Sequence, residues 1–122
     1  MWIAVVLGAL IVLALFTTPC IYRLAGNVYY AHHVRVAGDI QTMRVQLEVY
    51  HSMNGSFPPT EQGLQPLIKA PTASPQPAQL PKDPWGTSYI YRCPGLKHPS
   101  GYDLFSAGPD KRADTADDDW GE

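Results

Sequence analysis

The chain has 122 residues, a net formal charge of −2 and 16% charged side chains. Its basic residues are scattered, so the sequence predicts no nucleic-acid partner. Setting aside an apolar N-terminus leaves about 100 residues, which is enough for one small domain with a single core and excludes a second domain.

The N-terminal segment is uncharged, because the first charged side chain is Arg23. A helix over residues 1–22 would span about 33 Å, close to the roughly 30 Å hydrocarbon thickness of a bilayer. The run is too long for the apolar part of a signal peptide and lacks a basic start. It therefore predicts an uncleaved membrane-spanning helix.

A second, amphipathic helical segment is predicted over residues 23–54. Apolar residues recur there at spacings of three and four, and they are Val36, Ile40, Met43, Leu47 and Tyr50. Opposite charges four residues apart lie outside this face, in the pairs Arg35 with Asp39 and Arg44 with Glu48. The pattern predicts one helix that runs from the apolar segment into a domain.

A proline-rich loop is predicted over residues 57–84. The helix ends at Asn54-Gly55, because glycine adopts the left-handed conformation of a helix terminus and the prolines that follow prevent its resumption. Thr60 is predicted to cap a short helical turn over residues 61–68. Residues 71–80 are predicted to be irregular.

A small hairpin is predicted after this loop. Lys82–Gly86 contains a tight turn, with proline at its second position and glycine at its fourth. Alternation over residues 87–92, which places Tyr89 and Tyr91 on one side, and over residues 102–106 predicts two antiparallel strands. Because a two-stranded sheet is unstable alone, it must pack on the amphipathic helix.

The end of the chain is acidic, and its carboxylates are Asp110, Asp114, Asp117, Asp118, Asp119 and Glu122. So many carboxylates in one loop repel one another unless a cation joins them. Calcium binds six to eight oxygens, which carboxylates and backbone carbonyls supply together. The spacing does not match an EF-hand. A solvated, frayed terminus is the alternative interpretation.

The cysteines and histidines of the chain do not indicate a disulfide, a metal site or a catalytic site. Cys20 lies in the apolar run and Cys93 in a polar setting, so we expect both to be unpaired. His32 and His33 point about 100° apart on a helix, which is wrong for two ligands of one metal. No arrangement of acids and bases indicates catalysis, and the sequence predicts no enzyme.

The order of motifs resembles the major pseudopilins of bacterial type II secretion, the general secretion pathway protein G family. The residues that carry the resemblance cover nearly the whole chain. They are the apolar helix with Val6-Leu7-Gly8, the helix end Tyr50–Gly55, Phe57–Leu64, the turn Lys82–Gly86, Tyr89–Tyr91 with Pro94-Gly95, and Tyr102–Asp110.

The resemblance implies a type IV pilin-like α+β fold, in which a long N-terminal helix packs on a small antiparallel sheet. The implied domains are a filament-core helix over 1–22 and a periplasmic domain over 23–122. The periplasmic domain comprises the amphipathic helix 23–54, the loop 57–84, the hairpin 87–106 and an acidic calcium loop over 107–122.

The function implied by the resemblance is structural. Such subunits polymerise through their N-terminal helices into a filament that drives export of folded proteins across the outer membrane. The implied location is the bacterial inner membrane, crossed once, with the C-terminal domain in the periplasm. The implied partners are further copies of the chain, minor pseudopilins, the inner-membrane assembly platform and, if a leader is encoded upstream, the prepilin peptidase.

The resemblance also implies one calcium ion in the C-terminal loop. The carboxylates that match the family are Asp110, Asp117 and Asp118, and carbonyls near Ala107 and Thr115 complete the implied ligand set. Asp114 and Asp119 stay open as substitutes or as solvent-facing residues.

The start of the sequence departs from the family. Members begin with a basic leader and a cleavage motif of the type Gly-Phe-Thr-Leu-Ile-Glu, and Met1 aligns just after that glutamate. Basic residues follow the apolar span rather than precede it, which by the positive-inside rule alone favours a cytoplasmic C-terminal part. We therefore expect in-frame codons upstream of Met1 to encode the leader.

Two other functions stay open. One is a membrane-tethered, calcium-binding periplasmic module that caps or assists the filament without polymerising. The other is a type IV pilin, although pilins usually close their C-terminal region with a disulfide and no suitable cysteine pair exists here. Formation of filaments by the overproduced protein discriminates the polymerising subunit from the tethered module.

Overall fold

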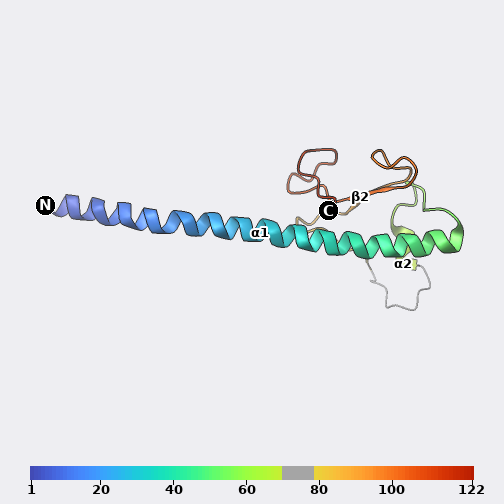
Figure 1. Cartoon of the computed structure of the whole chain (residues 1–122), viewed down its shortest axis with the longest axis horizontal. Helices are drawn as coiled ribbons and strands as arrows, with labels where there is room; N and C mark the ends of the chain where they lie inside the picture. Colours follow the sequence, from blue (N-terminus) through green and yellow to red (C-terminus); the bar gives the residue numbers. More distant parts are fainter. Residues whose placement is uncertain (70–78) are drawn as a thin grey trace. The chain divides into compact units, whose positions relative to one another are not determined.

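The computed structural model describes residues 1–69 and 79–122, with backbone alone for residues 14–25 and Lys69. The elements are the helices α1 (Trp2–Asn54) and α2 (Gln65–Lys69) and the strands β1 (Ile90–Arg92) and β2 (Asp103–Phe105) (Figure 1). The predicted combination of a long helix and a small sheet is confirmed. Most of the predicted irregular segment 71–80 lies outside the described residues.

The chain divides into two compact units, Met1–His32 and His33–Glu122, and α1 contributes to both. The first unit is helical, and its large apolar side chains over residues 1–13 are exposed. Residues 14–22 of the predicted membrane segment lie outside the described side chains. Within the side chains that the structure describes, no helix combines the length and hydropathy that a membrane crossing requires.

The core of the second unit is built on one face of α1. Val36, Ile40, Met43 and Leu47 are at most 1% exposed, which confirms the predicted face. Tyr50 was predicted to belong to this face but is only half-buried, since it lies in the last turns of the helix. The helix ends as predicted, because Gly55 adopts a φ of 77° and its N–H donates to the His51 carbonyl at 2.7 Å.

The segment after α1 is pinned to the hairpin. The Thr60 hydroxyl donates to the Cys93 carbonyl at 3.0 Å and accepts from the Cys93 N–H at 2.9 Å. The predicted capping role of Thr60 is therefore wrong, and α2 begins five residues later, at Gln65. Cys93 is a free thiol, as predicted.

The two strands pair antiparallel, with Tyr91 opposite Leu104. They are shorter than the predicted strands, because flanking residues form turns and single bridges instead. Tyr89 and Tyr91 are both buried, which confirms that they share the core face. The sheet thus packs Leu104 and both tyrosines into one cluster with the buried face of α1.

The predicted tight turn before the sheet is organised by a buried carboxylate. The Gly86 N–H donates to the Asp83 carbonyl at 2.9 Å, which closes the turn. The Asp83 side chain is 2% exposed and accepts from the Thr87 N–H at 2.7 Å and from the Ser106 hydroxyl at 2.7 Å. Ser106 follows β2, so this carboxylate ties the turn to the start of the acidic loop.

Candidate functional site

The acidic loop is closed at its base by a single antiparallel bridge. The Ser106 N–H donates to the Asp119 carbonyl at 2.8 Å, and the Asp119 N–H donates to the Ser106 carbonyl at 2.9 Å. Ser106 is fully buried, so the start of the loop is fixed against the core. The residues in between form a closed loop rather than a loose end.

The two limbs of this loop approach closely at Gly108 and Asp117. Gly108 has a φ of 65°, and a β-carbon there would collide with the Asp117 carbonyl oxygen. The Asp110 N–H donates to Asp117 Oδ2 at 3.1 Å. The neighbouring Ala107 is 2% exposed. The structure thus brings the predicted residues Ala107, Asp110 and Asp117 to one side of the loop.

Asp117 is held as an ionised carboxylate by local donors. The Thr115 hydroxyl lies 2.7 Å from Asp117 Oδ1, and this contact and the Asp110 N–H lower the pKa of Asp117. Thr115 therefore joins the same cluster. Among the described residues, the Thr115 carbonyl accepts one long hydrogen bond, from the Asp118 N–H at 3.4 Å.

Asp118 is only half satisfied. Its Oδ2 accepts from the Asp114 N–H at 2.8 Å and from the Thr115 N–H at 3.2 Å. Its Oδ1 is buried and has no hydrogen-bond partner in the described part of the chain. Burial, with the charges of Asp114 and Asp110, raises the pKa of Asp118. An ionised carboxylate oxygen in this position lacks a positive partner.

The unpartnered Asp118 Oδ1 is the type of oxygen ligand that a hard cation such as calcium binds. Over the described ranges, no three His, Cys, Asp or Glu side chains are grouped as metal ligands. A calcium site here would therefore combine Asp117 and Asp118 with backbone carbonyls, which calcium accepts readily. The residues present are of the right type for that mixture.

Two other acids of the loop bind elsewhere in the fold. Asp114 pairs with Arg92 through two contacts of 2.8 Å, and the pair lowers the pKa of Asp114. Asp119 contacts His33 Nδ1 through both oxygens, at 2.9 and 3.0 Å. Neither acid faces solvent alone, and both fasten the loop to the rest of the domain.

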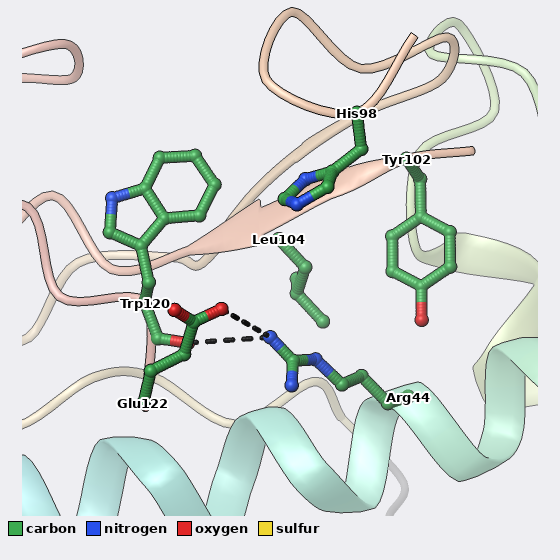
Figure 2. A pocket seen from close by; sticks show the side chains of 6 residues that line it. All are labelled: Arg44, His98, Tyr102, Leu104, Trp120 and Glu122. Carbon is green, nitrogen blue, oxygen red and sulfur yellow. Dashed lines mark hydrogen bonds and ion pairs between the residues drawn. The ribbon is translucent and has the colours of Figure 1, made fainter. Parts of the chain in front are cut away.

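The last residues pack on the domain, so the alternative of a frayed terminus is wrong. Trp120 stacks on Phe105 at a ring distance of 4.3 Å, and Gly121 lies against Ala37 of α1. Arg44, which we predicted to pair with Glu48, reaches this segment instead. Its guanidinium lies 3.5 Å from the Trp120 carbonyl and 3.9 Å from the Glu122 carboxylate (Figure 2).

A second carboxylate organises the connection between the strands. Asp103 is 1% exposed and accepts from the N–H groups of Leu96, Lys97 and His98 at 2.6, 2.9 and 3.1 Å. The His98 ring adds a contact of 3.0 Å. Burial works to raise the pKa of Asp103, but these hydrogen bonds outweigh it and lower the pKa.

Sequence reasoning missed His33, Arg92, Asp103 and Trp120 as partners of the loops. Asp103 gave the only local signal, since the amides that it binds lie five to seven residues before it. The contact of His33 with Asp119 spans 86 residues, which no local pattern encodes.

Comparison with known proteins gives consistent matches. Residues 23–120 match the family model described as type II secretion system (T2SS), protein G. The chain is 40% identical to the type II secretion system core protein G of Dickeya chrysanthemi, over 93% of this chain and 78% of the relative. It is 38% identical to the protein of that name from Escherichia coli K12, over 95% of this chain and 86% of the relative.

A solved structure is similar as well. It is the crystal structure of the major pseudopilin from the type 2 secretion system of enterohaemorrhagic Escherichia coli. The likeness has a TM-score of 0.65 and 36% identity, and it covers 78% of this chain and 90% of that chain. It confirms the predicted fold class.

Proposed function

The chain belongs to the type II secretion system protein G family, and from that premise we propose that it polymerises through α1 into a helical filament. The family is one of structural pseudopilin subunits, so the predicted function as a pseudopilin is confirmed. The filament, in this proposal, drives export of folded proteins across the outer membrane. We propose no catalytic role.

The exposed apolar surface of α1 carries this proposal. The large apolar side chains at residues 1–13 are between 53% and 101% exposed, and they are Met1, Trp2, Ile3, Val5, Val6, Leu7, Leu10, Ile11, Val12 and Leu13. Exposing apolar surface to water costs about 25 cal/mol per Å². Patches of this extent mark interaction surfaces, so these residues need lipid or neighbouring helices around them.

We propose that both environments are used in turn. Before assembly, the segment 1–22 anchors the chain once in the inner membrane, with the C-terminal domain in the periplasm. In the filament, the same segment packs on copies of itself. The proposed partners are therefore further copies of this chain, minor pseudopilins and the inner-membrane assembly platform. Prepilin peptidase joins them if a leader is encoded upstream.

We further propose that the acidic loop binds one calcium ion. Asp117 and Asp118 would supply carboxylates, and Ala107 and Thr115 would supply carbonyls. Asp110, the third carboxylate of the proposed set, is not grouped with them in the described part of the chain. Support comes from the buried, unpartnered Oδ1 of Asp118 and from the approach of the limbs at Gly108. The ion would supply the positive charge that the carboxylates lack and would hold the limbs together.

The test of polymerisation is overproduction of the chain, from its native start codon, with its own assembly machinery. Electron microscopy should reveal long filaments that contain it. Protein that enters the membrane and folds, yet forms no filaments, would favour the tethered module that caps or assists without polymerising. The intact mass and N-terminal sequence of the native protein test the expected leader. The relatives' names favour a type II secretion subunit over a type IV pilin.

A further inference from the structure

Ser106, at the start of the acidic loop, is held by both its backbone and its side chain. Its N–H and carbonyl form the bridge to Asp119. Its hydroxyl donates to Asp83 Oδ2 at 2.7 Å and accepts from the Gly108 N–H at 3.1 Å. Ser106 is fully buried, so water does not compete for these hydrogen bonds. The hydroxyl therefore connects the turn Lys82–Gly86 with the peptide that enters the acidic loop.

The direction of this hydroxyl is fixed by Asp83. A carboxylate accepts hydrogen bonds and donates none, so the Ser106 hydroxyl proton points to Asp83. A lone pair of the Ser106 oxygen is then free to accept from the Gly108 N–H. Asp83 is itself fixed, because it also accepts from the N–H groups of Trp85 and Thr87, at 3.2 and 2.7 Å, and from the Thr87 hydroxyl at 2.9 Å.

The hydrogen bond to the Gly108 N–H also fixes the Ala107 carbonyl, because the two groups belong to one peptide unit. This peptide bond is trans. In a planar trans peptide, the N–H and the carbonyl point in opposite directions. The Ala107 carbonyl therefore points away from the Ser106 hydroxyl, and any rotation of the peptide would break the Gly108 hydrogen bond.

The Ala107 carbonyl is buried without a partner. Ala107 is 2% exposed, and no other described residue donates a hydrogen bond to its carbonyl. Buried carbonyl groups are nearly always paired, because an unpaired one loses its hydrogen bonds to water without compensation. Asp118 Oδ1 is a second buried, unpartnered oxygen of the same loop. Carbonyl and carboxylate oxygens of this kind are ligands that calcium accepts.

We propose that Asp83 and Ser106 are positioning residues of the calcium site, which hold the Ala107 carbonyl in the orientation of a ligand. The inference rests on the calcium site proposed above for the acidic loop. Neither residue belongs to the proposed ligand set. Asp83 acts through the Ser106 hydroxyl, and Ser106 acts through the Gly108 N–H. Loss of the groups that orient metal ligands typically weakens metal binding about 10- to 100-fold.

The test is a calorimetric titration with calcium chloride of the full chain in detergent, after removal of bound metal with a chelator. Ser106→Ala should raise the dissociation constant at least about tenfold, because the Ala107–Gly108 peptide is then free to rotate. Asp83→Asn should raise it too, since an amide can donate to the Ser106 hydroxyl and no longer directs its proton. The double variant should match Ser106→Ala alone, because Asp83 acts through that hydroxyl. Effects that multiply would overturn this order of action.

A matched control separates positioning from general stability. Asp103→Asn also neutralises a buried carboxylate that accepts backbone N–H groups, but in the connection between the strands. It should lower the melting temperature in chelator and leave the dissociation constant within about twofold of wild type, because it lies outside this network. Melting in chelator identifies a temperature at which each variant is folded for the titration. If Asp103→Asn weakened calcium binding as much as Asp83→Asn, the proposal would be wrong.

A measurement on the wild-type protein needs no substitution. Calcium binding should move the NMR amide signal of Thr87, which donates to Asp83, together with that of Gly108. The amide signal of Leu96, which donates to Asp103, should stay in place. A Thr87 signal that does not respond to bound calcium would overturn the link between the turn and the site.

The titration also distinguishes the two proposals. Wild-type protein that binds no calcium would refute the calcium site and this inference with it. Wild-type binding that Ser106→Ala leaves unchanged would refute the positioning role alone, and the calcium site would stand.

Discussion

Two loops of the second unit are each organised by a carboxylate, which is buried in one loop and half-buried in the other, and the two carboxylates differ in how many of their oxygens have hydrogen-bond partners. In the strand connection, Asp103 accepts three backbone N–H groups and contacts the His98 ring. In the acidic loop, Asp118 satisfies one oxygen and leaves the other buried without a partner. The first loop is complete with protein groups alone. In the second loop, Asp118 lacks a positive partner, which is the observation behind the proposed calcium ion.

The largest effect should come from the core on which both loops rest. Leu47→Ala should destabilise the protein by about 2–5 kcal/mol, because the side chain is fully buried. Chemical denaturation of the full chain in detergent measures it. Val45→Ala is the control, since Val45 lies on the same helix but is 55% exposed. A loss below about 1 kcal/mol for Leu47→Ala would mean that this face is not the core.

The next largest loss of stability should come from the strand connection and should not depend on calcium. Asp103→Ala should cost about 2–3 kcal/mol, since three N–H groups lose an ionised acceptor, and added calcium should not restore the loss. Thermal melting with calcium and with chelator measures both. Asp103→Asn retains one oxygen and should cost less. If calcium restored the melting temperature of Asp103→Ala, the two loops would not differ in their dependence on a cation.

Calcium should stabilise the wild-type protein through the acidic loop. At a concentration 100-fold above its dissociation constant, a ligand adds about 2.7 kcal/mol, which raises the melting temperature by several degrees. Asp118→Asn should abolish this shift while leaving the melting temperature in chelator nearly unchanged, because it removes an unpaired charge. Asp117→Ala should flatten the response too. Glu122→Gln should preserve it, and identical wild-type curves in calcium and chelator would rule out the site.

The smallest effect is a dependence on pH. The folded pKa of Asp103 lies below its ordinary value, so its stabilisation is present above the unfolded pKa of about 3.9 and is lost as pH falls through the folded pKa. In chelator, the difference in unfolding free energy between wild type and Asp103→Asn should therefore shrink below about pH 4. A difference that grows on acidification would contradict the assigned role of Asp103.

Local sequence patterns predicted the features of the fold that depend on neighbouring residues, such as the buried helix face and the tight turn. The spacing of Val36, Ile40 and Leu47 located the core face, and proline and glycine located the turn that Asp83 closes. The loop partners were not predictable, because Arg44 meets Trp120 across 76 residues and the helical spacing pointed to Glu48 instead. The predicted ligands Ala107, Asp110, Asp117, Asp118 and Thr115 lie in one loop, but their binding of calcium stays a prediction.

The contact of His33 with Asp119 affects the order in which the domain folds during synthesis. Asp119, which fastens the acidic loop to α1, is synthesised 86 residues after its partner His33. Closing a long loop costs entropy before the contact repays it, and distant contacts form slowly. During synthesis, the helix face around Ala37 and Ile40 is therefore formed before Gly121 is available to cover it. This unit is complete only after Gly121 has been synthesised, so a chain that stalls before that residue would expose this face to proteases and to other chains.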